Sequence, residues 1–157
     1  MGSLRAVLTE WESMFRGNHP TRVDEKGRLK LPADFKRVVE ERYGTQFYIT
    51  SRDGRDAEIY PMQEWEKFEQ KLAEIPNFNP AKKKLLNYVN YYGQTTEMDS
   101  QGRVLLPQIL REKTNTLGDV LVFGMQTFLK VTNREAFVAS LEPMTEADER
   151  ELENFKL

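Results

Sequence analysis

The sequence predicts an α+β fold that contains two pseudo-symmetric copies of one βαβ-type module within 157 residues. The first observation is an internal repeat, because residues 23–32 (VDEKGRLKLP) align with residues 98–107 (MDSQGRVLLP) at an offset of 75. Asp, Gly, Arg, Leu and Pro are identical in the two segments. The second observation is that the same order of helix and strand signals follows each segment. The predicted order of elements in each copy is therefore strand, turn, strand, helix, strand, strand, helix.

In the first copy, the repeat segment alternates apolar and polar residues around a glycine, which is typical of a hairpin with one buried face. A helix is expected over 32–43, because proline suits the first turn of a helix and glycine follows its end. Apolar strands are expected over 46–51 and 57–60. A second helix should follow, on which apolar residues recur every three or four positions, namely Met62, Trp65, Phe68, Leu72 and Ile75.

The second copy repeats this order with shorter signals. A helix is expected over 107–117, again between a proline and a glycine, and strands are expected over 120–124 and 127–131. Thr132 and Glu135 have the spacing of a capping box, so they predict the start of a last helix.

Asparagine followed by proline at 79–80 predicts a further helix over 80–92, which links the two copies. Its lysine run at 82–84 is either a solvated helix face or a secondary phosphate contact. The predicted organisation is an N-terminal extension of residues 1–13, whose place in the native chain stays open, a first module (14–79), a linker helix (80–92), a second module (93–141) and an acidic C-terminal tail (142–157).

Composition narrows the classes of function. The chain has no cysteine, which excludes disulfides, thiolate metal sites and cysteine nucleophiles. The absence of cysteine fits a reducing, cytoplasmic location. No apolar run approaches the roughly 20 residues that span a bilayer, so no membrane contact is expected. The net charge is only −2, but residues 15–37 hold seven bases against three acids, and residues 142–157 hold six acids against two bases. Residues 15–37 therefore form a basic segment, where an acidic partner is expected to bind.

The motif Asp-x-x-Gly-Arg occurs once in each copy. We expect Gly27 and Gly102 to adopt a positive φ that other residues avoid. Asp24 and Asp99 are then placed to accept backbone N–H groups of the turn or to pair with the arginine that follows. Each arginine would therefore be held in a fixed position.

These residues carry a resemblance to a known family. The segment Met14-Phe15-Arg16-Gly17, the two Asp-x-x-Gly-Arg motifs and the stretch from Tyr60-Pro61 to Trp65-Glu66 resemble the MraZ family. The resemblance runs from residue 14 to about residue 141, and the paired motifs are its most specific part. It implies that the two copies form between them an AbrB-like swapped-hairpin β-barrel with flanking helices, which single-module relatives build from two chains.

The resemblance also implies a function. MraZ proteins are cytoplasmic, nucleoid-associated transcriptional regulators that assemble into ring-shaped homo-oligomers. They bind direct repeats in double-stranded promoter DNA of the division and cell-wall gene cluster. The expected protein is not an enzyme and needs no cofactor, metal or small-molecule substrate. The residues expected to contact DNA are Arg22, Lys26, Arg28, Lys30 and Arg103, with the first copy making most of the contacts because its turn is the more basic.

Other functions stay open at this stage. An AbrB-like antitoxin or a nucleoid architectural protein would share the same module, and an acidic tail that binds a toxin would favour the antitoxin. A more remote alternative is an enzyme with a site between the halves near Asp24, Asp99 and His19, the only histidine. Pairing of each aspartate with an arginine would keep it ionised and unsuited to proton transfer.

Overall fold

The structure is a computed structural model that describes residue 11 and residues 14–157, so the expected extension over residues 1–13 lies outside the described part apart from Trp11. The strands are β1 (Asn18–Val23), β2 (Arg28–Lys30), β3 (Gln46–Thr50), β4 (Ala57–Pro61), β5 (Gln94–Glu97), β6 (Arg103–Leu105), β7 (Gly118–Gly124) and β8 (Leu129–Asn133). The helices are α1 (Ala33–Val38) with its π-helical continuation η1 (Val39–Tyr43), α2 (Met62–Ala73), α3 (Pro80–Tyr91), α4 (Gln108–Thr114), α5 (Arg134–Ser140) and α6 (Glu146–Glu153).

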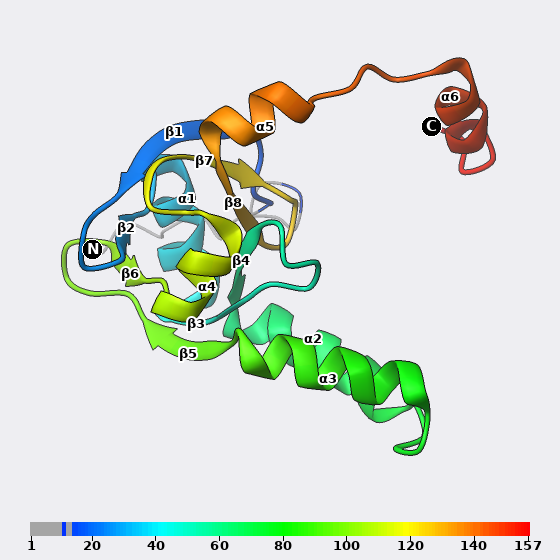
Figure 1. Cartoon of the computed structure of the whole chain (residues 1–157), viewed down its shortest axis with the longest axis horizontal. Helices are drawn as coiled ribbons and strands as arrows, with labels where there is room; N and C mark the ends of the chain where they lie inside the picture. Colours follow the sequence, from blue (N-terminus) through cyan, green and yellow to red (C-terminus); the bar gives the residue numbers. More distant parts are fainter. Residues whose placement is uncertain (1–10, 12–13) are drawn as a thin grey trace, which may run out of the picture.

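All eight strands belong to one antiparallel sheet in the order β5-β3-β4-β8-β7-β1-β2-β6, which curves into a nearly closed barrel (Figure 1). The strands are exchanged between the copies. Strand β1 of the first copy pairs with β7 of the second, and β5 of the second pairs with β3 of the first. The expected α+β fold with a swapped-hairpin barrel is confirmed.

The two repeat segments meet at the pseudo-symmetry axis. Strand β2 pairs with β6 over three residues, with Leu29 opposite Val104. Beyond the strands, the N–H of Leu31 donates to the carbonyl of Gly102, and the N–H of Leu106 donates to the carbonyl of Gly27, each at 2.9 Å. The two hairpins therefore cover each other through reciprocal hydrogen bonds.

A single core fills the barrel. It draws inward-facing residues from both copies, and Leu29, Phe47, Leu106 and Leu129 are fully buried in it. Burying each such side chain contributes about 1.5–3 kcal/mol, so the core that stabilises the barrel is shared by the two copies.

Short helices follow the repeat segments and close the barrel ends. Helix α1 continues into a π-helical turn, which the sequence does not predict, and the helical segment ends at Gly44 as predicted. Helix α4 ends earlier than the predicted 107–117, because Asn115 adopts a left-handed conformation with φ 53°. A polar residue with a short side chain tolerates this conformation and stops the helix before Leu117, which is left exposed.

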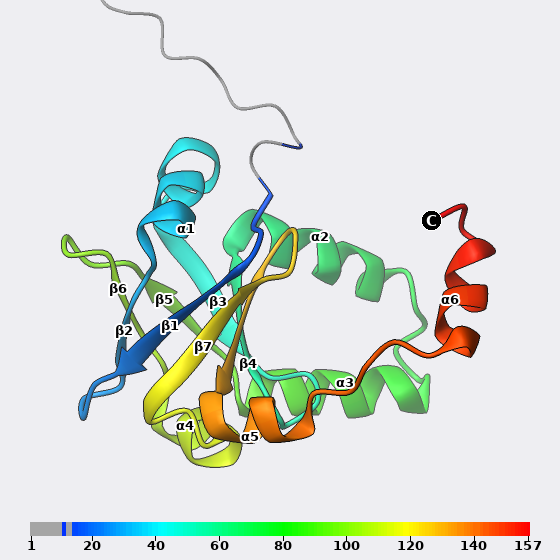
Figure 2. The same ribbon diagram turned by 90° about the horizontal axis from the view of Figure 1, so that it is seen from above.

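Helices α2 and α3 form a helical hairpin that projects from the barrel (Figures 1 and 2). Helix α3 is fastened to the sheet at its C-terminal end, where the carbonyl of Val89 accepts hydrogen bonds from Tyr48 Oη at 3.0 Å and Thr50 Oγ1 at 2.7 Å. Lys82 does not match either expectation for the lysine run. It is 7% exposed, and its Nζ donates to the carbonyl of Ile75 at 2.7 Å, where it fixes the loop before α3.

The second copy ends in α5 and α6. The predicted capping box at Thr132 and Glu135 is wrong by one residue, because Thr132 still belongs to β8 and Asn133 caps α5 by accepting the N–H of Ala136 at 2.9 Å. Helix α6 stands away from the barrel on an extended segment (Figures 1 and 2). Within the part of the chain that the structure describes, no helix has the length and apolar character needed to cross a membrane.

Candidate nucleic-acid interface

The turn of the first hairpin is built around Asp24. Its Oδ1 accepts the backbone N–H groups of Lys26 at 3.0 Å and Arg28 at 2.8 Å, while its Oδ2 accepts Nε–H of Arg28 at 2.8 Å. Gly27 lies at φ 86°, as expected. One carboxylate thus holds the turn and the arginine side chain at once. Because an arginine has five N–H donors, this pair leaves the other edge of the guanidinium for a second acceptor.

The turn of the second hairpin has the same geometry. Oδ1 of Asp99 accepts the N–H groups of Gln101 and Arg103, and its Oδ2 accepts Nε–H of Arg103, all at 2.9 Å. Gly102 lies at φ 77°. The two motifs are therefore structural equivalents, and each arginine has the predicted fixed position.

Both carboxyl groups are kept in their charged form. The pKa of Asp24 lies below its usual value, chiefly because the backbone N–H of Arg28 donates to the carboxylate. The backbone N–H of Arg103 lowers the pKa of Asp99 in the same way. A group held ionised in this way is a poor proton donor at neutral pH. The pKa shifts therefore disfavour an acid/base role for the two aspartates.

The pairing of β2 with β6 brings basic side chains of both copies onto one outward surface. Arg28 lies opposite Leu105, and Lys30 lies opposite Arg103, while the alternate residues of both strands point into the core. Arg103 is thus a cross-strand neighbour of Lys30 and not part of a separate surface. The sequence alone does not reveal this register.

Two further basic residues reach the glycine turns from the helices. A Cβ built on Gly27 would overlap the guanidinium of Arg111, and one built on Gly102 would approach Cδ of Lys36 at 3.1 Å. Each helix of one copy therefore lies against the turn of the other copy. Nη1 of Arg111 donates to the carbonyl of Leu106 at 3.1 Å, which fixes its head group beside the turn.

Arg111 and Lys36 were not among the site residues that the sequence suggested. Their positions differ by the repeat offset of 75, so the repeat itself held the signal. We call the basic surface over β2, β6 and the two turns the hairpin face, and it consists of Lys26, Arg28, Lys30, Lys36, Arg103 and Arg111.

Arg22 lies next to the hairpin face, because β1 pairs with β2 in a register that sets Val23 opposite Leu29. It is on β1, directly opposite Asp119 of β7, and its Nη1 lies 3.2 Å from Oδ1 of that aspartate. Both side chains are largely exposed, at 73% and 69%. An exposed pair of this kind contributes about 0–1 kcal/mol, so Asp119 holds the head group of Arg22 only weakly.

His19 does not join the two aspartates. Its ring packs edge-on against Phe35 with centroids 5.0 Å apart, and its Nε2 lies 3.8 Å from the carboxylate of Asp34. Among residue 11 and residues 14–157, no group of three or more His, Cys, Asp or Glu side chains has an arrangement that could hold a metal ion.

Comparison with known proteins gives consistent matches along the chain. The family model described as "MraZ protein, putative antitoxin-like" matches twice, over residues 14–88 and 93–155. A protein of Acidobacterium capsulatum named "Transcriptional regulator MraZ" is 70% identical over 146 residues, which cover 92% of this chain and 100% of that protein. Proteins with the same name from Koribacter versatilis and Syntrophobacter fumaroxidans are 54% and 35% identical, over 88% and 81% of this chain and 97% and 84% of their own lengths.

Proposed function

The chain belongs to the MraZ family, and on that premise we propose that it is a transcriptional regulator that binds double-stranded DNA through the hairpin face. The observation that carries the proposal is the geometry of this face. Six basic side chains from both copies surround two rigid turns, and the register of β2 and β6 aligns Arg28, Lys30 and Arg103 on one side of the sheet. The major groove admits a two-stranded β-ribbon of this kind.

We assign two kinds of contact to the face. Lysines bind phosphates, which positions the protein on the duplex without reading its sequence. Arg28 reads a base, because Asp24 holds its Nε–H and leaves the N–H donors of its other edge for a second acceptor. A pre-oriented guanidinium loses little conformational entropy on pairing with O6 and N7 of a guanine. Arg103 contributes in the same way, with fewer basic neighbours on its own turn.

The finer parts of the proposal follow the family resemblance. We propose that the targets are direct repeats in the promoter of the division and cell-wall genes, within the cytoplasmic nucleoid. Copies of the chain assemble into a ring, so that several hairpin faces meet several repeats at once and weak contacts gain through effective concentration. No reaction is assigned to the protein.

We also keep the division of the chain into modules 14–79 and 93–141 as a proposal about folding. The exchange of β1 and β5 between the copies supports one cooperative unit, because each hairpin completes the sheet of the other module.

The test compares Arg28→Ala with Arg103→Ala in the full chain. The two variants lose the same ion pair, at 2.8 and 2.9 Å, so each serves as the structural control for the other. Binding is measured by competition between two duplexes: one from the DNA upstream of the gene that encodes this chain, and one with the same bases in scrambled order. We expect Arg28→Ala to lose roughly 1–3 kcal/mol of discrimination, with a smaller loss in Arg103→Ala. Arg134→Ala on α5 controls for loss of a surface charge.

The result separates three cases. Equal melting temperatures with a selective loss of discrimination in Arg28→Ala support the proposal. Unchanged discrimination in both folded variants would show that the hairpin face does not read DNA. Strong binding of both duplexes by the unmodified chain would instead identify a nucleoid architectural protein.

A further inference from the structure

Within residue 11 and residues 14–157, no other helix or strand packs extensively against the C-terminal helix α6. None of its residues is buried, and Phe155 and Leu157, which follow it, are 72% and 85% exposed. Thr145 and Asp148 form a capping box at its start, so the helix is well defined in spite of its isolation. An eight-residue helix without tertiary contacts is only marginally stable in water. Helix α6 therefore needs a surface to pack on.

The charge of α6 indicates which kind of surface it can pack on. Its eight residues, EADERELE, include five acids and one base. Leu152 is the only half-buried residue of α6, and the exposed Phe155 and Leu157 extend the apolar side of the segment. A matching surface must combine positive charge with exposed apolar or aromatic side chains.

Helix α3 offers this combination. Its sequence, PAKKKLLNYVNY, contains three lysines and no acid. A shallow groove of about 770 Å³ runs along its outer side, where Lys84, Tyr88 and Tyr91 line it. Tyr91 is 64% exposed, and Lys83 and Lys84 are exposed beside it. The side chain of Lys113 from α4 reaches the same region, since it lies with Tyr88 against Gly54.

We propose that α6 of one copy of the chain docks in the α3 groove of a second copy. The acids of α6 lie against Lys83 and Lys84, and the apolar end with Phe155 and Leu157 covers the exposed tyrosine rings. This contact joins unlike surfaces of the two copies, so repetition of it closes a ring or extends a filament. The inference rests on the self-assembly part of the proposed function and names the surfaces that carry it.

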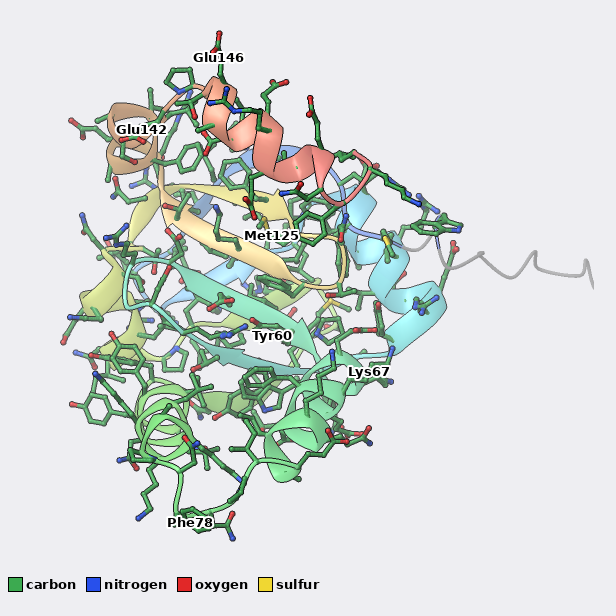
Figure 3. The ribbon with its side chains drawn as sticks, turned by 90° about the vertical axis from the view of Figure 1, so that its right-hand side faces the viewer. Tyr60, Lys67, Phe78, Met125, Glu142 and Glu146 are labelled. Carbon is green, nitrogen blue, oxygen red and sulfur yellow. The ribbon has the colours of Figure 1, made fainter. Side chains whose placement is uncertain are left out.

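The geometry disfavours docking of α6 on α3 of the same chain. Figure 3 shows α6, marked by Glu146, at one edge of the molecule and the turn between α2 and α3, marked by Phe78, at the other, with the sheet between them. Figure 1 shows the same separation. Only residues 141–145 connect α5 to α6, and five residues span at most about 17 Å. The tether holds α6 on the side of α5 and away from its own α3.

The α3 groove also lies apart from the hairpin face. In Figures 1 and 2 the two glycine turns lie at one end of the barrel, while α3 and α6 project from the other. The surface with lysines and tyrosines is therefore not an extension of the candidate DNA surface. An acidic helix of the same chain is the occupant that the charges favour, and nucleic acid in this groove is the alternative that the experiment must separate.

The test reverses charges on each side of the contact in the full chain. The variants are Lys83→Glu/Lys84→Glu on α3 and Glu149→Lys/Glu153→Lys on α6, and sedimentation velocity over a concentration series measures assembly. All four residues are exposed, so the fold of a single chain is retained. We expect either variant to raise the dissociation constant of the assembly by on the order of 100-fold, because like charges then face each other. The chain that carries all four substitutions should assemble again.

The controls are Lys71→Glu and Glu66→Lys on the exposed side of α2, which should leave assembly unchanged. If both double variants assemble like the unmodified chain, the α3 groove is not the docking site, although self-assembly stands. If Lys83→Glu/Lys84→Glu weakens DNA binding and leaves assembly intact, the groove binds nucleic acid and the inference is wrong. If the unmodified chain is a monomer at every concentration, self-assembly itself fails.

Discussion

The two hairpin turns share one geometry and differ in their chemistry. In both, an aspartate accepts two backbone N–H groups and an arginine Nε–H, and the glycine has a positive φ. The outward positions differ, since Lys26 and Lys30 of the first turn correspond to Gln101 and Leu105 of the second. Asp, Gly and Arg therefore build the scaffold, while outward positions within and after the motif differ between the two copies. On this account the variable positions decide how much each turn binds DNA.

The shared geometry of the turns also bears on the roles of the two arginines. The basic neighbours of Arg28 favour it as the reading residue, but Arg103 has the same bond to its aspartate and lies opposite Lys30. Their structural roles are equal. Any difference between the two must therefore come from contacts with the partner and not from stability of the turn.

Replacement of the turn glycines is expected to lower the free energy of unfolding more than any other change considered for the two turns. In Gly27→Ala and Gly102→Ala a left-handed backbone costs about 1–2 kcal/mol. We expect Gly27→Ala to be the more destabilising, because its Cβ must displace the Arg111 side chain and lies 3.0 Å from the Leu106 carbonyl oxygen. At Gly102 the three nearest atoms all belong to the flexible end of Lys36. Chemical denaturation of the full chain measures both.

Gly17→Ala provides the matched control for this comparison. Gly17 has φ 80°, and no described atom lies within 4 Å of its Cβ position, so this variant reports the backbone cost alone. Equal destabilisation by all three substitutions would show that the contacts between each helix and the opposite turn add nothing to stability.

A smaller effect is expected from pH. The folded-state pKa values of Asp24 and Asp99 lie below the usual value, so their hydrogen bonds stabilise the fold above about pH 4. This stabilisation is lost as the pH falls through the lowered folded-state pKa values. We expect Asp24→Asn and Asp99→Asn each to flatten the acid limb of the curve of melting temperature against pH. Because the turns are equivalent, the two variants should behave alike, and a clear difference would break the comparison.

The repeat and the order of its elements were enough to predict two equivalent copies, since each strand signal in one copy had a counterpart in the other. The swapped-hairpin barrel itself was implied by the family resemblance that the paired motifs carry. Features that depend on packing between the copies were not predictable. The position of Arg111 over Gly27 and the pairing of Lys30 with Arg103 arise only when β2 meets β6. The spacing of residues within one copy does not predict the register between β2 and β6.

Local errors have local physical causes. Thr132 fits a capping box by spacing, but its backbone pairs with Leu121, which keeps it in β8 and moves the cap to Asn133. Lys82 appears in a run of exposed lysines, yet its Nζ finds the carbonyl of Ile75 and is buried. In both cases a tertiary hydrogen-bond partner decided between two arrangements that the sequence allowed.

Two turns with the same scaffold carry unequal charge, and on this account the charge decides how strongly each turn binds DNA. Exchange of the outward residues tests this most directly. The first variant, Lys26→Gln/Lys30→Leu, gives the first turn the residues of the second, and Gln101→Lys/Leu105→Lys does the reverse. Affinity falls as salt rises, and each phosphate contact adds about 0.9 to the steepness of the plot of log affinity against log salt. We predict that the first exchange makes this plot less steep by about 2 and that the second makes it steeper, with melting temperatures nearly unchanged. An unchanged slope in a folded Lys26→Gln/Lys30→Leu protein would contradict the account.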